Sequence, residues 1–469
     1  MRLRKGDRIE LWIDGMASGG RGVARMDGLV VFVRGAVAGD RVMARILKKK
    51  RDYAEADLTG LISPSPDRIR APCPFHGYCG GCQWQHLKYE RQLVYKREQV
   101  RDSMTHIGSL PEVPVHEVLP SDRVFRYRNK MEFSFSHQRW LLPGDYGTEA
   151  KTGEFGLGLH VPGTFDKVID IHGCLLQEKT GDEILNEVKG FVKRSRIPVY
   201  SLKSHRGFWR FLVLRYSASR DEWMVNLVTS GENRKIVSAL ADHLGERFGN
   251  IRTVINSINT GKAAVATGQK EIILSGKGYF HDMIGPYEFR ISSNSFFQTN
   301  SSGAERLYNT VVRYAGLHGP EVVLDLYCGT GTIPVFLSGH AREVIGMEIS
   351  EGAVMDANVN CGLNHVTNCR FIQGDIRNTL SDPGLIPDVL VVDPPRGGIH
   401  RDVLAGIMRS AAKKVVYVSC NPATMARDMA GLSERYDLVE IQPVDMFPHT
   451  HHVEAVAKLV LREAATLKS

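Results

Sequence analysis

Residues 322–331 have the sequence VVLDLYCGTG, an apolar strand that runs directly into a glycine-rich turn. Further short apolar segments follow, separated by stretches long enough for a helix: EVIGMEI, CRFIQGD, DVLVVDPP and KVVYVSC. Strands that alternate with helices in this way predict a doubly wound, mostly parallel sheet. We therefore expect residues 291–469 to form a Rossmann-like α/β domain.

The turn suits a ligand that contains a nucleoside. It has the spacing Asp325-x-x-x-Gly329-x-Gly331, and Glu348 ends the next strand. Glycines let the backbone approach a ligand, and a carboxylate at the following strand end can bind ribose hydroxyls. The third glycine of the dinucleotide fingerprint is missing, which disfavours a nicotinamide enzyme. Together with Gly374-Asp375 and Asp393, the pattern resembles that of S-adenosylmethionine-dependent methyltransferases.

Asp393-Pro394-Pro395 ends the fourth strand of this series. It resembles the motif of enzymes that methylate planar nitrogen, in which an aromatic residue usually follows. Here Arg396 follows instead. This difference counts against amino-group methylation, which is kept as an alternative activity.

The fifth strand ends at Cys420, and Asn421-Pro422 stops it at once. Carbon 5 of uracil accepts a methyl group only after a thiolate has added to carbon 6, and such catalysis needs an accessible cysteine at the cofactor edge of the sheet. A lone strand cysteine is more often a core residue. We assign that core role to Cys328, Cys361 and Cys369, and we expect Cys420 to be the nucleophile.

A methylated carbon 5 still carries a proton that must be removed. His449-Thr-His-His-Val-Glu454 precedes a last apolar strand, which would return a carboxylate to the same edge. Glu454 is therefore the expected general base. The alternatives are a solvated glutamate, or a metal site made from the three histidines and Glu454.

Length and composition indicate a globular protein of two or three domains, with 469 residues of which 43% are hydrophobic. The sequence contains no long uninterrupted apolar stretch, so we expect no membrane span and a cytoplasmic protein. The net charge is +8, and residues 1–60 hold 13 Lys/Arg against 8 Asp/Glu. Such an excess suits a polyanion such as RNA, or a solvated basic face.

The rest of the chain divides into two further regions. Residues 1–62 contain short strands separated by Gly-rich turns, which predict a small β-barrel of the kind that often binds nucleic acid. Residues 63–290 mix basic helical stretches with alternating strands. We expect this central region to form an α+β domain.

Four motifs together resemble the RNA 5-methyluridine methyltransferase family: Ser419-Cys-Asn-Pro422, His452-Val-Glu454, Asp393-Pro-Pro-Arg-Gly-Gly398 and Ser295-Phe-Phe-Gln-Thr-Asn300. The likeness covers nearly the whole chain, and residues 1–62 resemble the family's TRAM domain, an RNA-binding barrel. It implies that Cys420 is the nucleophile and Glu454 the base. It also implies cofactor contacts from Gln298, Tyr327, Glu348 and Asp393, with Thr332 and Asp375 added. Thr332 stands where many relatives have Asn, which loosens one expected contact.

A second group of cysteines is not part of this chemistry. Cys73-x5-Cys79-Gly-Gly-Cys82 is joined by the distant Cys174. Four thiolates suit either a cubane iron-sulfur cluster or structural zinc, and His76, His86 and His172 keep zinc open. The motif from Phe75 to His86 resembles the iron-sulfur subgroup of the family, which implies a structural [4Fe-4S] cluster on the four cysteines.

A stacked uracil must leave its RNA helix to reach a thiol, so we expect an unpaired loop as the target and basic stretches such as 88–101 and 48–51 to hold the backbone. A TRAM domain with an iron-sulfur cluster resembles the 23S ribosomal RNA enzymes more than the compact bacterial transfer RNA enzymes, although some relatives with both features act on transfer RNA. A monomer is expected. The remaining alternatives are an RNA-binding protein with an inactive methyltransferase fold, and cytosine-5 methylation, whose cysteine often follows Pro rather than Ser419.

Overall fold

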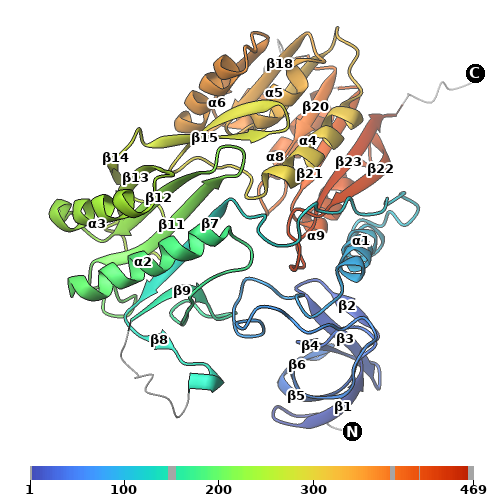
Figure 1. The fold of residues 1–469 in the computed structure, drawn as a ribbon. Coiled ribbons are helices and arrows are strands. Elements are labelled where there is room, and N and C mark those ends of the chain that lie inside the picture. The colour runs from blue at the N-terminus through green and yellow to red at the C-terminus, as the bar shows by residue number, and fades with distance from the viewer. Residues whose placement is uncertain (1–2, 146–154, 381–385, 411, 463–469) are drawn as a thin grey trace, which may run out of the picture.

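The computed structural model describes residues 3–145, 155–380, 386–410 and 412–462. These residues form three large sheets and a separate two-stranded hairpin. In Figure 1 the N-terminal sheet lies at one end, the C-terminal sheet at the other, and the central sheet between them on one side. Within the described ranges, no helix has the length and apolar character needed to cross a membrane.

The N-terminal sheet is a six-stranded barrel in the order β1-β5-β6-β4-β3-β2. Its strands are β1 (Arg8–Trp12), β2 (Gly15–Ala17), β3 (Arg21–Met26), β4 (Leu29–Arg34), β5 (Arg41–Lys49) and β6 (Tyr53–Ser63). Apolar side chains alternate with exposed ones along β1 and β5, so one face of the curled sheet fills the interior with residues such as Ile9, Leu11 and Ile46. The predicted barrel is confirmed.

The central sheet has eight strands in the order β14-β13-β12-β11-β7-β9-β10-β8. They are β7 (Lys130–Ser136), β8 (Arg139–Trp140), β9 (Gly156–His160), β10 (Val168–Asp170), β11 (Trp209–Ser217), β12 (Glu222–Thr229), β13 (Ile251–Ile258) and β14 (Lys270–Ser275). The apolar faces of α2 (Lys179–Ser195) and α3 (Arg234–Arg247) share one core with this sheet. A hairpin of β15 (Tyr279–Ile284) and β16 (Tyr287–Ser292) leads to the C-terminal part.

The C-terminal sheet has the order β19-β18-β17-β20-β21-β23-β22. Its strands are β17 (Val322–Leu326), β18 (Glu343–Glu348), β19 (Cys369–Gln373), β20 (Val389–Val392), β21 (Lys414–Ser419), β22 (Tyr436–Val444) and β23 (Glu454–Leu461). The helices are α4 (Ser301–Ala315), α5 (Thr332–Ser338), α6 (Glu351–Leu363), α7 (Ile376–Thr379), α8 (Arg401–Ser410) and α9 (Pro422–Leu432). Strands β17 to β21 are parallel and β23 is antiparallel, with an apolar core on each face. The predicted doubly wound α/β fold is confirmed.

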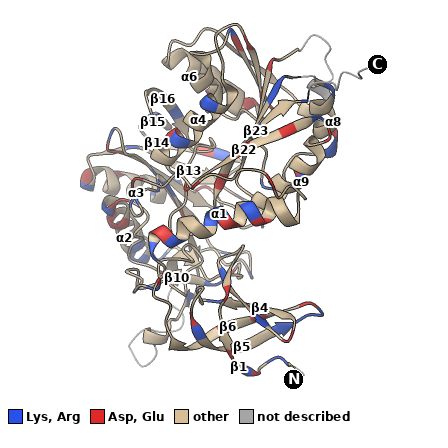
Figure 2. Cartoon of the chain, turned by 90° about the vertical axis from the view of Figure 1, so that its right-hand side faces the viewer, with Lys and Arg blue, Asp and Glu red and all other residues tan. Residues whose placement is uncertain are grey.

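Helix α1 (Tyr89–His106) connects the barrel to the C-terminal sheet, where it packs on α9 and β22. Figure 2 shows that acidic and basic residues both occur along it. Lys96 is fully buried and donates a 2.6 Å hydrogen bond to Asp445, so it cannot contact RNA as the sequence had suggested for the stretch 88–101. Residues 48–51, at the end of β5 and in the turn that follows it, are exposed as that expectation requires.

Candidate active site

The strand register brings Cys420 and Glu454 to the same edge of the sheet. β17, β20 and β21 are parallel neighbours, so Tyr327, Asp393 and Cys420 all follow carboxyl ends of strands. β23 runs the other way and pairs Ala455 with Ser419. Because of that pairing, the first residue of β23 lies beside the residue that follows β21.

A sharp turn from strand to helix presents Cys420. Ser419 Oγ accepts a 3.0 Å hydrogen bond from Asn421 N, and Asn421 Oδ1 accepts one of 3.1 Å from Ala423 N. Asn421 therefore caps α9, and Pro422 stands at the first helical position, where its missing N–H costs nothing. The turn leaves Cys420 partly exposed.

The electrostatics of the edge disfavour negative charge. Burial, followed by the neighbouring carboxylates of Glu454 and Asp393, raises the pKa of Cys420 to about 11. Burial and then Asp393 raise the pKa of Glu454 to about 8, and burial raises the pKa of Asp393 to about 6. The Arg396 guanidinium opposes the shifts of both Cys420 and Glu454. Arg396 is thus a cation that lowers the pKa of both side chains.

Arg396 is a site residue whose role sequence reasoning missed, because it entered only as a mismatch to the amino-methylating motif and as part of a family motif. Its main-chain oxygen accepts hydrogen bonds from Asn421 Nδ2 and Thr424 Oγ1, at 3.2 and 3.3 Å. Its Nη2 lies 3.2 Å from His452 Nδ1. The motif is thus tied both to the start of α9 and to the segment before Glu454. A basic residue directly after Asp393-Pro-Pro was the available signal.

The glycine-rich turn forms an open cradle beside these residues. Gly329 has φ 54°, and among the described residues a Cβ there would meet no atom within 4 Å. Its N–H donates to Glu348 Oε2 at 3.1 Å, and Ser350 N donates to Oε1 at 2.9 Å. These bonds fix the Glu348 carboxylate while leaving acceptor capacity on both oxygens. The arrangement fits a ligand with ribose hydroxyls.

Buried carboxyl groups lie under the cradle. Asp325 is fully buried, and neither of its carboxylate oxygens has a hydrogen-bond partner among the described residues. Burial, then Asp393 and Glu348, raises the pKa of Asp325 well above its ordinary value. Carboxylates gathered at one edge favour a cationic ligand and repel a phosphate-bearing one. The edge therefore fits S-adenosylmethionine, a sulfonium, better than a dinucleotide.

The other expected cofactor residues lie around the same turn. Tyr327 follows β17 with φ 67°, and burial, followed by the nearby Asp375 carboxylate, raises its pKa. Asp375 itself pairs with Arg377, which lowers its pKa to about 2. Thr332 and Gln298 both bond to the buried Tyr308 hydroxyl, Thr332 from 3.2 Å. Thr332 therefore already has a partner within the chain.

Cys73, Cys79, Cys82 and Cys174 line one cavity of about 340 Å³ between the residues before α1 and the central sheet. Burial raises their pKa values, to about 11 for Cys79 and about 12 for Cys82. Among the residues that the structure describes, no group of three or more His, Cys, Asp or Glu is arranged to hold a metal ion. The thiols surround a volume rather than converge on one point.

The histidines that kept zinc open have other partners. His76 Nε2 lies 2.7 Å from His86 Nδ1, and the His172 ring packs on Phe75 with centroids 5.2 Å apart. The rings considered as a metal site with Glu454 also diverge: His449 bonds to Gln92, His451 to Gln83 and His452 to Arg396. Neither set of histidines is therefore gathered around a common centre.

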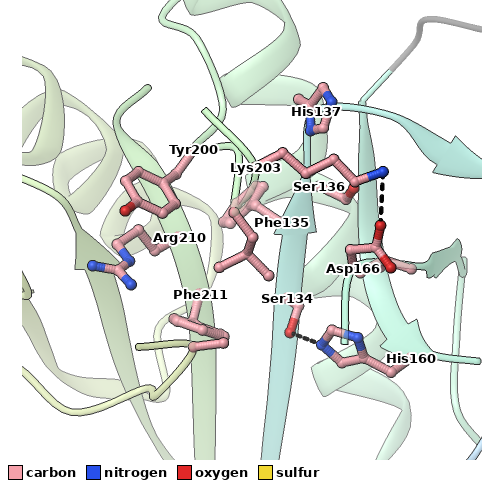
Figure 3. Close-up of a pocket in the computed structure, with 13 residues that line it drawn as sticks. Ser134, Phe135, Ser136, His137, His160, Asp166, Tyr200, Lys203, Arg210 and Phe211 are labelled. Carbon is pink, nitrogen blue, oxygen red and sulfur yellow. Dashed lines mark hydrogen bonds and ion pairs between the residues drawn. The ribbon is translucent and has the colours of Figure 1, made fainter. Parts of the chain in front are cut away.

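A separate hollow on the central sheet contains a Ser134–His160 pair at 2.8 Å and a Lys203–Asp166 ion pair at 2.9 Å (Figure 3). The Ser134–His160 pair has the residue types of a hydrolase site. The space there is only about 20 Å³, room for about one water molecule. Such a water would satisfy the buried His160 Nδ1, which has no partner among the described residues. The hollow is too small for an organic substrate.

Known proteins resemble this chain along nearly its whole length. The family model described as tRNA (uracil-5-)-methyltransferase matches residues 258–377 and 386–462, and the TRAM domain model matches residues 2–59. Uncharacterised RNA methyltransferases from Chlorobaculum tepidum and Porphyromonas gingivalis are 41% and 40% identical, over 97% and 96% of this chain and 97% and 99% of theirs. The crystal structure of the Pyrococcus abyssi tRNA (uracil-54, C5)-methyltransferase in complex with S-adenosyl-L-homocysteine is 30% identical. Its TM-score is 0.75, over 96% of this chain and 100% of that one.

Proposed function

The chain belongs to the family of RNA uracil-5-methyltransferases, and we propose that it methylates carbon 5 of a uridine through a covalent bond between Cys420 and the ring. The observation that supports this most directly is the register of β21 and β23, in which Ser419 faces Ala455. A thiol and a carboxylate are thereby neighbours at the edge that carries the glycine-rich turn. These are the two groups that the reaction needs.

In the proposed mechanism the Cys420 thiolate adds to carbon 6 of uracil, which makes carbon 5 a nucleophile. S-adenosylmethionine supplies the methyl group that carbon 5 receives. The Glu454 carboxylate then removes the proton that remains on carbon 5. The electrons of that C–H bond re-form the enolate, which expels the thiolate and restores the double bond between carbons 5 and 6. Each turnover adds one methyl group and releases one proton.

We assign the cofactor contacts to the residues around the glycine-rich turn. Glu348 keeps acceptor capacity for ribose hydroxyls, and Asp393 adds negative charge toward the cationic part of the ligand. Gln298 and Tyr327 complete the set. Asp375 is proposed as a further contact, and Thr332 acts through the Tyr308 hydroxyl that it bonds.

We propose 23S ribosomal RNA as the substrate, because a TRAM domain together with the four-cysteine segment resembles the large-subunit ribosomal RNA enzymes. Transfer RNA is the second candidate, favoured by the likeness to the Pyrococcus abyssi enzyme over 96% of this chain. Mapping 5-methyluridine in both RNAs from cells that lack the protein separates the two. The missing modification identifies the substrate.

We further propose that Cys73, Cys79, Cys82 and Cys174 hold a structural [4Fe-4S] cluster. Their shared cavity of about 340 Å³ is larger than one zinc ion needs, since zinc binds thiolates at about 2.3 Å. His76 and His86 bond to each other, which leaves a set of four thiols alone. Metal analysis of anaerobically purified protein distinguishes iron and sulfide from zinc.

Trapping with 5-fluorouridine RNA tests the function. Fluorine cannot leave carbon 5 as a proton, so the wild-type protein with S-adenosylmethionine should form a covalent complex that survives a denaturing gel. Cys420→Ala should form none. An amino-methyltransferase would methylate RNA without any such complex, and that result would reject the proposed mechanism.

A further inference from the structure

The segment before Glu454 has an unusual backbone that its neighbours must hold. Residues 445–453, here called the strap, connect β22 to β23. His449 in its middle has φ 66°, a left-handed conformation that costs energy for a residue with a Cβ. Its side chain is buried, with 4% of its surface exposed. Contacts from outside the strap must offset this cost.

The first such contacts come from residues 73–85, here called the cysteine loop because it carries three of the four cavity cysteines. Gln83 N and Trp84 N both donate to the main-chain oxygen of His449, at 3.0 and 2.9 Å. Gln83 Oε1 also accepts from His451 Nδ1 at 3.2 Å. Gln83 directly follows Cys82 in the chain, so this contact lies next to a cavity cysteine.

Gln92 of α1 joins the cysteine loop and the strap through one fully buried side chain. Its Oε1 accepts from His449 N at 2.8 Å. Its Nε2 donates to Trp84 O at 3.1 Å and to Leu87 O at 2.8 Å. Each buried bond of this kind is costly to lose, since the groups left behind have no water to replace it.

The strap ends at the proposed catalytic groups. His452 contacts Arg396, and Val453 is followed directly by Glu454. Cys420 lies between β21 and the capped start of α9, away from the strap, whereas Glu454 begins β23 at the strap's end. A disturbance of the strap should therefore move the carboxylate while leaving the thiol in position.

We propose that the cysteine loop and Gln92 clamp the strap and so position Glu454 for proton removal, an inference that rests on the proposed function. Gln83 and Gln92 are positioning residues in this scheme. Loosening the clamp should slow the step after methyl transfer. The enzyme should then accumulate as a covalent adduct with methylated RNA.

Gln92→Leu and Gln83→Ala test the clamp. Gln92→Leu should lower turnover on uridine RNA at least 10-fold. Gln83→Ala removes the His451 bond but keeps the main-chain bond to His449, so it should lower turnover severalfold. In both variants the first burst of S-adenosylhomocysteine should stay near the wild-type amplitude. The fraction of enzyme bound covalently to RNA on a denaturing gel should rise severalfold. Gln99→Leu in the same helix is the matched control, because Gln99 Nε2 makes no hydrogen bond within the described residues. It should behave like the wild type.

The outcomes separate this inference from the function on which it rests. If Glu454→Gln accumulates the methylated adduct but the clamp variants do not, the clamp is rejected and the base assignment stands. If Glu454→Gln forms no adduct, the base assignment itself is wrong. If Gln92→Leu fails to fold, the half-exposed Gln83→Ala decides. A loss of burst and turnover together, without adduct, overturns the proposal.

Discussion

Cys420 and the cysteines of the cavity differ in the charges that surround them, although burial is the main reason for raised pKa values in both. Beside Cys420 lie the Arg396 cation, which lowers the pKa of the thiol, and the Glu454 carboxylate, which raises it. Cys82 instead faces Cys174, Cys79 and Cys73, each of which raises its pKa further.

This difference matches the roles proposed for them, a nucleophile at Cys420 and metal ligands in the cavity. A thiol with its own cation can ionise alone and attack a substrate. Arg128 lines the cavity and lowers the pKa of Cys174, but the neighbouring thiols raise the pKa values of Cys79 and Cys82. A bound metal cluster would supply the positive charge that lets all four ionise. The same substitution, Cys to Ser, should therefore have opposite consequences in the two regions.

Cys420→Ser should produce the largest effect on activity. A serine hydroxyl is a far weaker nucleophile at neutral pH, so methyl incorporation into RNA should fall at least 1000-fold, an order of magnitude typical for the loss of covalent catalysis. The melting temperature should change by no more than about 2 °C, because Cys420 lies at the partly exposed end of its strand. Labelled-methyl transfer and a thermal melt measure both. Activity near the native rate would contradict the proposed chemistry.

Cys79→Ser should reverse that pattern. The protein should lose iron and its brown colour, and its melting temperature should fall by about 5 °C or more because the cysteine loop loses its anchor. Iron analysis, visible absorbance and thermal unfolding check this, with Cys361→Ser in the C-terminal core as a control that should retain iron. A variant with full iron content would remove Cys79 from the ligand set.

Glu454→Gln should change the pH dependence of stability in the cofactor-free protein. The pKa of Glu454 is about 8 in the folded state and 4.5 ordinarily, so the unfolded chain loses its proton first as pH rises. Wild-type stability should therefore decline between pH 4.5 and 8, a loss of order 2–4 kcal/mol that the glutamine variant avoids. Urea unfolding at pH 5 and pH 9 measures it. An equal difference between the two proteins at both pH values would show that burial does not raise this pKa.

The sheet edge that carries Asp393, Cys420 and Glu454 could be predicted from sequence because it follows from regular structure. Parallel strands end at one edge, so Asp393 and Cys420 were placed by their position after strands, and the last strand added Glu454. Local patterns were enough, since a few consecutive apolar residues indicate each strand. The register between β21 and β23 then decided the distance between the two groups.

The clamp and the burial of α1 could not be predicted in this way. Gln92 and His449 are 357 residues apart in the chain, and Lys96 and Asp445 are 349 apart. A glutamine or lysine within a polar helix looks solvated until its partner is known, because no local period marks a tertiary hydrogen bond. The stretch 88–101 therefore suggested an RNA-binding surface, while part of it holds the domains together.

Arg396→Gln should have the smallest effect. It removes the cation that distinguishes the surroundings of Cys420 from those of Cys82. Without the cation, the pKa values of Cys420 and Glu454 should both rise, since Arg396 lowers each of them. The ascending limb of kcat/KM against pH should therefore move to higher pH, with roughly a 10-fold loss at pH 7.5 that recovers in part above pH 9. Arg396→Lys keeps the charge and should shift the profile less. A profile of unchanged shape in Arg396→Gln would mean that some other group prepares the thiol for attack.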